Sequence, residues 1–100
     1  MAAIQHTVVF RLAHPAGSEA EQAFLAAARD VLTSIPGVTE FRISDQVSPK
    51  SDLTFQFSMV FADDAAYRAY NEHPTHVAFV EERWGSEVAE FQEYDFTRRA

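Results

Sequence analysis

The sequence predicts an α+β domain whose elements follow the order strand, helix, strand, strand, helix, strand. Three observations lead to this fold class. Two segments place apolar residues at every second position, as strands with one buried face do. Two other segments repeat apolar residues at helical spacing, and each follows a residue that can cap a helix. The length of 100 residues suits one domain, so we expect a single domain over residues 1–100.

The first strand is expected over residues 4–12. Its apolar face carries the alternate residues Ile4, His6, Val8, Phe10 and Leu12. β-branched and aromatic side chains in such an alternation favour a strand. His6 is the single polar residue on this face, and the segment 14–17 breaks the strand with Pro15 and Gly17.

A helix is expected over residues 18–34. Ser18 and Glu21 have capping-box spacing, in which the hydroxyl accepts from a helical amide and the carboxylate reaches back. Apolar residues then recur at helical spacing, at Phe24, Ala28, Val31, Leu32 and Ile35. Pro36 and Gly37 end the helix.

Two strands are expected in the middle of the chain. Residues 38–47 form the weaker one, and residues 48–52 are a turn by composition. Residues 53–61 alternate most strongly, with the apolar side chains Leu53, Phe55, Phe57, Met59 and Phe61.

The second helical region is expected in two pieces. Asp63 can cap a helix that begins at residue 64. Pro74 disfavours helical geometry at His73 and suits the first turn of a new helix, so these residues form a joint. The second piece is expected to stop at Gly85 and to place on one face Val77, Val80 and Trp84.

A less regular strand over residues 88–96 closes the domain. Right-handed crossovers fold this order into one four-stranded antiparallel sheet with both helices on one face. The opposite face is semi-polar, and its residues from the first and third strands are Gln5, Thr7, Val9, Thr54, Gln56, Ser58 and Val60. Contact with solvent would suit this face, and so would packing against a second copy of the chain.

Composition argues against several classes of partner. A net charge of −7 with only 8 Lys and Arg residues argues against binding to nucleic acid or to an anionic membrane. No apolar run approaches the ~20 residues of a membrane span. The N-terminus lacks the features of a signal peptide, which favours the cytoplasm. The chain has no cysteine, so a disulfide, a thiolate nucleophile and a Cys–metal site are excluded.

Histidines and tyrosines are the candidates for chemistry. His6 is either a hydrogen-bonded core residue or part of a pocket, because a buried polar side chain needs a partner. His73 and His76 flank the joint at Pro74, where capping or hydrogen bonding is favoured over a metal pair. Zinc takes three or four protein ligands, so we expect no metal. The tyrosines Tyr67 and Tyr70 are neighbours on a helix, as boundary residues or as donors in a pocket.

Five segments together have the pattern of a known family. They are Ile4–Phe10, Ile35–Val38, Val47–Pro49, Tyr67–Val80 and Tyr94–Phe96. The Tyr-x-x-His-Pro-x-His motif from Tyr70 to His76 is the most specific of them. With these segments the chain resembles the stress-responsive A/B barrel family over about residues 3–97. The resemblance implies a ferredoxin-like protomer and a homodimer, in which two sheets pack by the faces away from their helices to form an α+β barrel.

The resemblance also implies a pocket between sheet and helices. One plant member type, olivetolic acid cyclase, closes a linear polyketide by aldol condensation, and its tyrosine and two histidines match Tyr70, His76 and His6. The matching binding residues are His73 and the apolar wall of Val8, Phe10, Phe24, Leu25, Phe57, Met59 and Phe79. A departure falls at Ala28, where the cyclase has a tyrosine, so the cyclase's own substrate is not implied.

Three functions are compatible with this pattern. The first is a cofactor-free cyclase or isomerase acting on an apolar carbonyl compound. In it His76 is the general base, held neutral by a helix N-terminus, Tyr70 is its hydrogen-bonding partner, and His6 orients the substrate. The second is a non-catalytic stress-response or ligand-binding dimer, and the third is a cofactor-independent oxygenase. None of them uses a cofactor, and the first two need the same apolar pocket.

Overall fold

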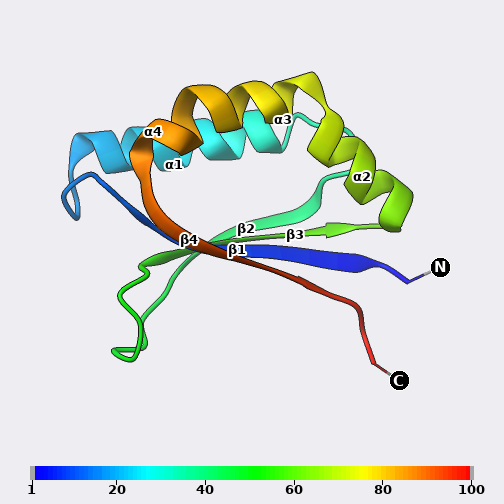
Figure 1. Cartoon of the computed structure of the whole chain (residues 1–100), viewed down its shortest axis with the longest axis horizontal. Helices are drawn as coiled ribbons and strands as arrows, with labels where there is room; N and C mark the ends of the chain where they lie inside the picture. The colour runs from blue at the N-terminus through cyan, green and yellow to red at the C-terminus, as the bar shows by residue number, and fades with distance from the viewer. Residues whose placement is uncertain (1, 100) are drawn as a thin grey trace.

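A computed structural model describes residues 2–99. The elements in chain order are β1 (Ile4–Leu12), α1 (Glu19–Leu32), β2 (Thr39–Asp45), β3 (Phe55–Phe61), α2 (Asp64–Glu72), α3 (Pro74–Phe79), the π-helical turn η1 (Val80–Trp84), α4 (Gly85–Glu87) and β4 (Val88–Phe96). The four strands form one sheet in the order β2-β3-β1-β4, and all neighbouring strands are antiparallel. The helices lie on one face of the sheet (Figure 1). The expected βαββαβ order and ferredoxin-like arrangement are confirmed.

The two central strands carry the core. The predicted apolar faces of β1 and β3 point to the helices, and Phe10, Phe57 and Phe61 are at most 1% exposed. The rings of Phe10 and Phe57 lie edge to face with centroids 4.6 Å apart. From α1, Phe24 packs against both of these rings. Burial of such aromatic side chains supplies most of the stabilisation available to a chain of this size.

Side-chain caps set the starts of the long helices. The Ser18 hydroxyl accepts a hydrogen bond from the Glu21 amide at 3.2 Å, as the capping box predicts. The Glu21 carboxylate accepts from the amide of Gly17, which has φ +76°, one residue earlier than in the standard box. Asp63 caps α2 by accepting from the Ala66 amide at 2.9 Å. Both predicted helix starts are therefore confirmed.

The strand β2 is shorter than expected and irregular. Its register with β3 shifts between Thr39 and Arg42, and Glu40 within this interval has a left-handed φ of 51°. A bulge of this kind interrupts the alternation of side chains along a strand. This irregularity accounts for the weak pattern that the sequence has here.

The joint at Pro74 is confirmed, but two other predictions for this region are wrong. His73 is extended, with φ −64° and ψ 133°, and separates α2 from α3. Gly85 does not end the helix, because it is helical and the chain continues in helical form to Glu87. Val77 is 41% exposed rather than buried, and Phe79 takes the inward position.

The wider turn η1 explains this change of face. In a π-helical turn, residues five apart lie nearly above one another, whereas in an α-helix they do not. Phe79 and Trp84 are five residues apart and both pack against the core. Within residues 2–99, no helix is both long and apolar enough to cross a membrane.

We expect Phe10→Ala to lower the free energy of unfolding by about 3–5 kcal/mol, because it leaves a cavity among packed aromatic rings. Urea denaturation at one fixed protein concentration measures this change. Val47 is 86% exposed, so Val47→Ala should change the same quantity by less than about 0.5 kcal/mol. Equal effects of the two substitutions would contradict the described core.

Candidate functional site

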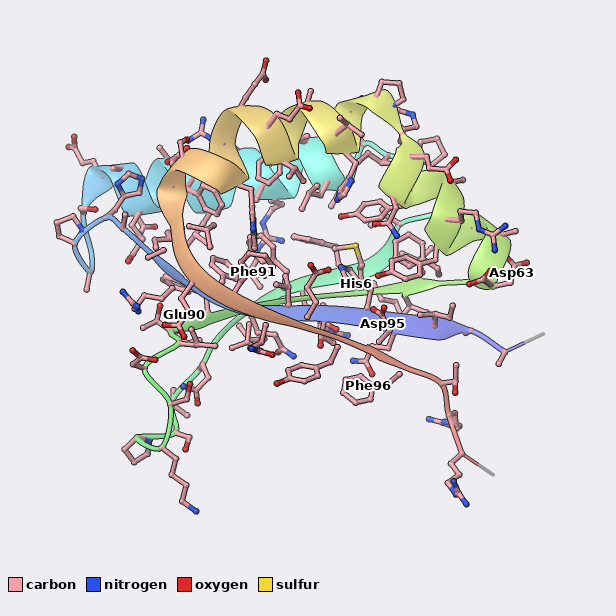
Figure 2. All side chains as sticks on the ribbon, viewed as in Figure 1. His6, Asp63, Glu90, Phe91, Asp95 and Phe96 are labelled. Carbon is pink, nitrogen blue, oxygen red and sulfur yellow. The ribbon has the colours of Figure 1, made fainter. Side chains whose placement is uncertain are left out.

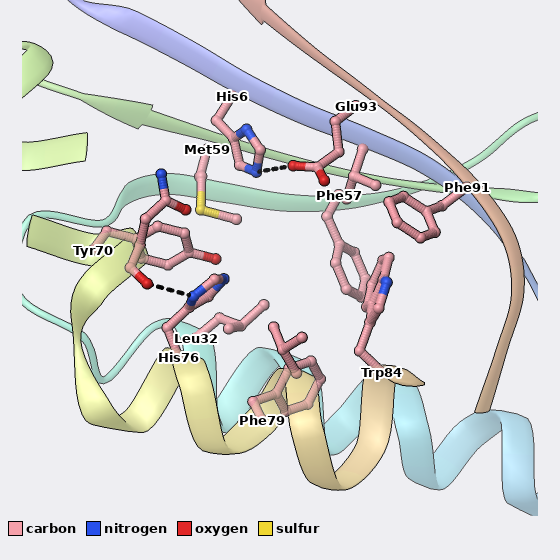
Figure 3. Close-up of a pocket in the computed structure, with 13 residues that line it drawn as sticks. His6, Leu32, Phe57, Met59, Tyr70, His76, Phe79, Trp84, Phe91 and Glu93 are labelled. Carbon is pink, nitrogen blue, oxygen red and sulfur yellow. Dashed lines mark hydrogen bonds and ion pairs between the residues drawn. The ribbon is translucent and has the colours of Figure 1, made fainter. Parts of the chain in front are cut away.

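A cavity of about 240 Å³ lies between the sheet and the second helical region. Figure 3 shows it as a space bounded by the helix-facing side of the strands and by α3 and η1. Its lining consists of His6, Val8, Leu32, Phe57, Met59, Tyr70, Asn71, His76, Phe79, Val80, Trp84, Phe91 and Glu93. Most of these side chains are apolar, and a few polar groups converge on one end, as in sites for small organic molecules.

His76 stands in the cavity as a neutral base. Its Nδ1 lies 3.2 Å from the backbone carbonyl of Asn71, which only accepts, so Nδ1 carries the hydrogen. In the neutral imidazole this leaves the lone pair on Nε2. Burial, and to a lesser extent the nearby His6, lower the pKa of His76 below its usual 6.5. The direction agrees with the sequence prediction, but burial is the main cause.

Tyr70 lies against His76 and keeps its proton. The ring centroids of the two residues are 4.4 Å apart, and Tyr70 is 2% exposed. Burial raises the pKa of Tyr70 well above its usual value of 10, so the hydroxyl stays a donor at neutral pH. No residue among 2–99 is hydrogen-bonded to this hydroxyl. A molecule in the cavity can therefore accept from it.

His6 is held by a carboxylate on the edge strand. Its Nδ1 lies 2.6 Å from Oδ1 of Asp95, which faces it across the β1–β4 pairing. The Tyr67 hydroxyl donates to the same carboxylate at 3.0 Å, and burial and this carboxylate raise the pKa of Tyr67 to about 12. Since Nδ1 donates to Asp95, Nε2 of His6 is left for the cavity. His6 is thus both a hydrogen-bonded residue and a cavity residue.

The structure brings together most of the predicted site. His6, Tyr70 and His76 line the cavity with the predicted wall residues Val8, Phe57, Met59 and Phe79. The remaining wall residues Phe10, Phe24 and Leu25 belong to the core beside the cavity and do not line it.

His73 is placed elsewhere. Its Nδ1 accepts a hydrogen bond from the Thr75 amide at 3.1 Å, so the side chain caps α3. It is not part of the cavity lining. The capping role that the sequence favoured for this region therefore falls to His73, while His76 turns inward.

Several site residues were missed by the sequence analysis. Phe91, Glu93 and Asp95 share one face of β4, and their period-two spacing was a signal that could have found them. Trp84 and Val80 reach the cavity through the π-helical turn, which the sequence does not indicate. Asn71 contributes its backbone carbonyl, for which no side-chain signal exists.

No group of three or more His, Cys, Asp or Glu side chains suited to a metal ion occurs among residues 2–99. The polar groups that line the cavity are two imidazoles, a phenol, an amide and a carboxylate. This set can donate, accept or transfer protons on an organic molecule.

Comparisons with known proteins agree with this arrangement. The family model described as "Stress responsive A/B Barrel Domain" matches residues 4–98. A Dabb family protein with a ferredoxin-like fold from Mesorhizobium loti is 50% identical, with full coverage of both chains and a TM-score of 0.98.

More distant structures share the fold. A dimeric ferredoxin-like protein of unknown function from Thermobifida fusca is 17% identical, with a TM-score of 0.77 over 97% of this chain and 92% of its own. A hydroxynitrile lyase from Passiflora edulis is 14% identical, with a TM-score of 0.82 over 97% of this chain and 94% of its own. No curated protein matches the sequence.

We expect acidification through pH 6.5 to destabilise the protein partly through His76. The pKa of His76 is lower in the folded chain than in the unfolded chain. As the pH is lowered, the unfolded chain therefore binds the proton first, and the free energy of unfolding decreases. The loss ends below the folded pKa, where both states are protonated. Urea denaturation between pH 8 and pH 5 should show a smaller loss for His76→Gln than for the unsubstituted protein. An NMR titration of His76 with a midpoint at or above 6.5 would contradict this.

Proposed function

Because this chain belongs to the stress-responsive A/B barrel domain family, we propose that it binds a small apolar carbonyl compound and acts on it without a cofactor. The observation that carries this proposal is the pairing of a half-buried imidazole, whose pKa is lowered, with a buried, protonated phenol in one apolar cavity. At about 240 Å³, the cavity lies below the ~300–1,000 Å³ of sites for drug-sized ligands. The compound is therefore about the size of one ring or a short alkyl chain.

His76 is the general base. Its Nδ1–H is held by the Asn71 carbonyl, and Nε2 takes a proton from the carbon next to the substrate carbonyl. The C–H electron pair moves into a carbon–carbon double bond, and the carbonyl π electrons move to oxygen. An imidazole whose pKa lies below 7 is mostly unprotonated at neutral pH, which this step requires.

Tyr70 and His6 hold the substrate from two sides. The Tyr70 hydroxyl donates to the carbonyl oxygen and stabilises the enolate as its charge develops. His6, oriented by Asp95, contacts the substrate from the strand side through Nε2. The enolate carbon then attacks a second carbonyl, as in an aldol closure, and the alkoxide that forms takes the proton back from His76. Where the substrate has a neighbouring carbon–carbon double bond, the conjugated enolate can instead take this proton at the far carbon, as in an isomerisation.

The fold is compatible with an enzyme, since one of its structural neighbours is a hydroxynitrile lyase. The same cavity would also serve a non-catalytic ligand-binding protein. Trp84 is the only tryptophan in the chain and lines the cavity, so its fluorescence reports occupancy independently of turnover.

The protein is further proposed to work as a homodimer through the face of the sheet that is opposite the helices. Tyr94 and Phe96 pair with Thr7 and Gln5 and so lie on this face, where they are 49% and 52% exposed. Two large rings on an open sheet face favour a partner. The structural neighbour from Thermobifida fusca is described as dimeric, which agrees with this proposal.

We expect His76→Ala to slow enzyme-catalysed exchange of the α-protons of 2-hexanone in deuterated buffer by about 10²–10⁴-fold, because it removes the base. Tyr70→Phe should slow it by about 10²-fold through loss of the donor to the enolate. Proton NMR at pH 7 measures the exchange. His14 lies outside the cavity lining, so His14→Ala is the matched histidine control and should leave the rate unchanged.

Unchanged exchange in His76→Ala would remove this residue from the mechanism. Quenching of Trp84 fluorescence by 2-hexanone with no exchange above buffer would favour the ligand-binding protein instead.

We expect light scattering at micromolar concentration to give twice the protomer mass of 11.3 kDa. Phe96→Asp should shift the mass towards one protomer, because it places a charge in an apolar contact. Val47 is an exposed loop residue, so Val47→Asp is the control and should leave the mass unchanged. A protomer mass for the unsubstituted protein would overturn the dimer.

A further inference from the structure

One carboxylate, that of Glu93, lines the cavity beside His6. Glu93 lies opposite Val8 in the β1–β4 pairing, so its side chain is on the helix-facing side of the sheet. Its Oε2 is 3.9 Å from Nε2 of His6, and the side chain is 53% exposed. Figure 3 shows Glu93 between His6 and Phe91, at the wall formed by the edge strand. The labels in Figure 2 show Phe91 and Asp95 on the same strand on either side of this position.

No cation among the described residues offsets this charge inside the cavity. The lining contains neither Lys nor Arg. Arg83, on η1, is directed to Glu87 at 3.0 Å and over the Phe24 ring. On α3, His76 is half-buried, and this partial burial lowers its pKa and favours the neutral imidazole.

A second carboxylate strengthens the negative character of the site. Asp95, on the same face of β4, lies 2.6 Å from Nδ1 of His6. Even a doubly protonated His6 would face both carboxylates and leave one negative charge in excess. An anionic ligand would thus meet a like charge and no guanidinium or ammonium group.

We propose that Glu93 is a specificity-determining residue, which makes the cavity favour uncharged compounds, most strongly those that present a hydroxyl or N–H donor to it, and reject carboxylates. This inference rests on the proposed function, since it names the class of carbonyl compound that the same cavity accepts. The carboxylate of Glu93 accepts the donor of the ligand, and a charged acceptor gives a stronger hydrogen bond than a neutral one. A ligand carboxylate at the same position is repelled and also lacks the donor.

The size of the selection follows from the exposure of Glu93. Two like charges about 4 Å apart in water repel by about 1 kcal/mol, which corresponds to about fivefold in affinity, and partial exclusion of water increases this. Loss of the donated hydrogen bond adds to the difference. We expect an uncharged amide to bind about 10-fold or more tightly than the carboxylate of the same shape.

The experiment compares hexanamide with hexanoate. The two probes have the same alkyl chain, and neither absorbs where tryptophan is excited. Their dissociation constants are measured at pH 8 by the quenching of Trp84 fluorescence, in the unsubstituted protein, in Glu93→Gln and in Glu90→Gln. Glu90 lies on the same strand with a similar exposure of 54% but faces the other way and pairs with Arg11, so Glu90→Gln removes an equal charge outside the cavity.

The expected result is a preference for hexanamide of about 10-fold or more in the unsubstituted protein and in Glu90→Gln. In Glu93→Gln this preference falls to about twofold or less, mainly because hexanoate binds more tightly. Equal binding of both probes to the unsubstituted protein, or an undiminished preference in Glu93→Gln, would overturn the role of Glu93 while the cavity stands as a binding site. Binding of neither probe to any of the three proteins would overturn the cavity as a binding site and this inference with it.

Discussion

The arrangement of the site depends on the burial of one histidine on a central strand. His6 is 5% exposed in a row of apolar side chains, and a buried imidazole is costly unless it is hydrogen-bonded. Asp95 on β4 provides this partner, with its Oδ1 2.6 Å from Nδ1 of His6. The Tyr67 hydroxyl on α2 donates a hydrogen bond to the same carboxylate. This contact fixes the register of the edge strand, and the same register then places Phe91 and Glu93 in the cavity wall. A requirement of folding thus sets the composition of the site.

The opposite wall depends on two departures from regular helix. Pro74 removes a helical hydrogen bond and leaves His73 extended, so α3 starts in a new direction and the His76 ring comes to lie 4.4 Å from that of Tyr70. The π-helical turn then rotates the following side chains so that Trp84 returns to the core side. Such turns are frequent at functional sites, and here the turn delivers a cavity residue.

The sequence predicted the fold well because period-two and capping signals are local. β1 and β4 have the bounds that were predicted, and Ser18 and Asp63 cap as expected. Gly85 was misread because its helical conformation depends on the π-helical turn before it, which no residue type marks. Of the site, Tyr70 and His76 were within reach through their motif, whereas the only sequence signal for Glu93 was its period-two spacing from Phe91 and Asp95. Spacing alone offered His73 and His76 the same capping role, and the direction of α3 makes His73 a cap and His76 a cavity residue.

Two features of the site suit proton transfer. The Tyr70 ring is buried, and its hydroxyl faces the cavity without a hydrogen-bonding partner among residues 2–99. The His76 imidazole has a lowered pKa, so folding opposes its protonation. Tyr70 and His76 lie together at the end of the apolar cavity where the polar groups converge. This arrangement suits a ligand that accepts the hydrogen bond of the Tyr70 hydroxyl and gives up a proton to His76.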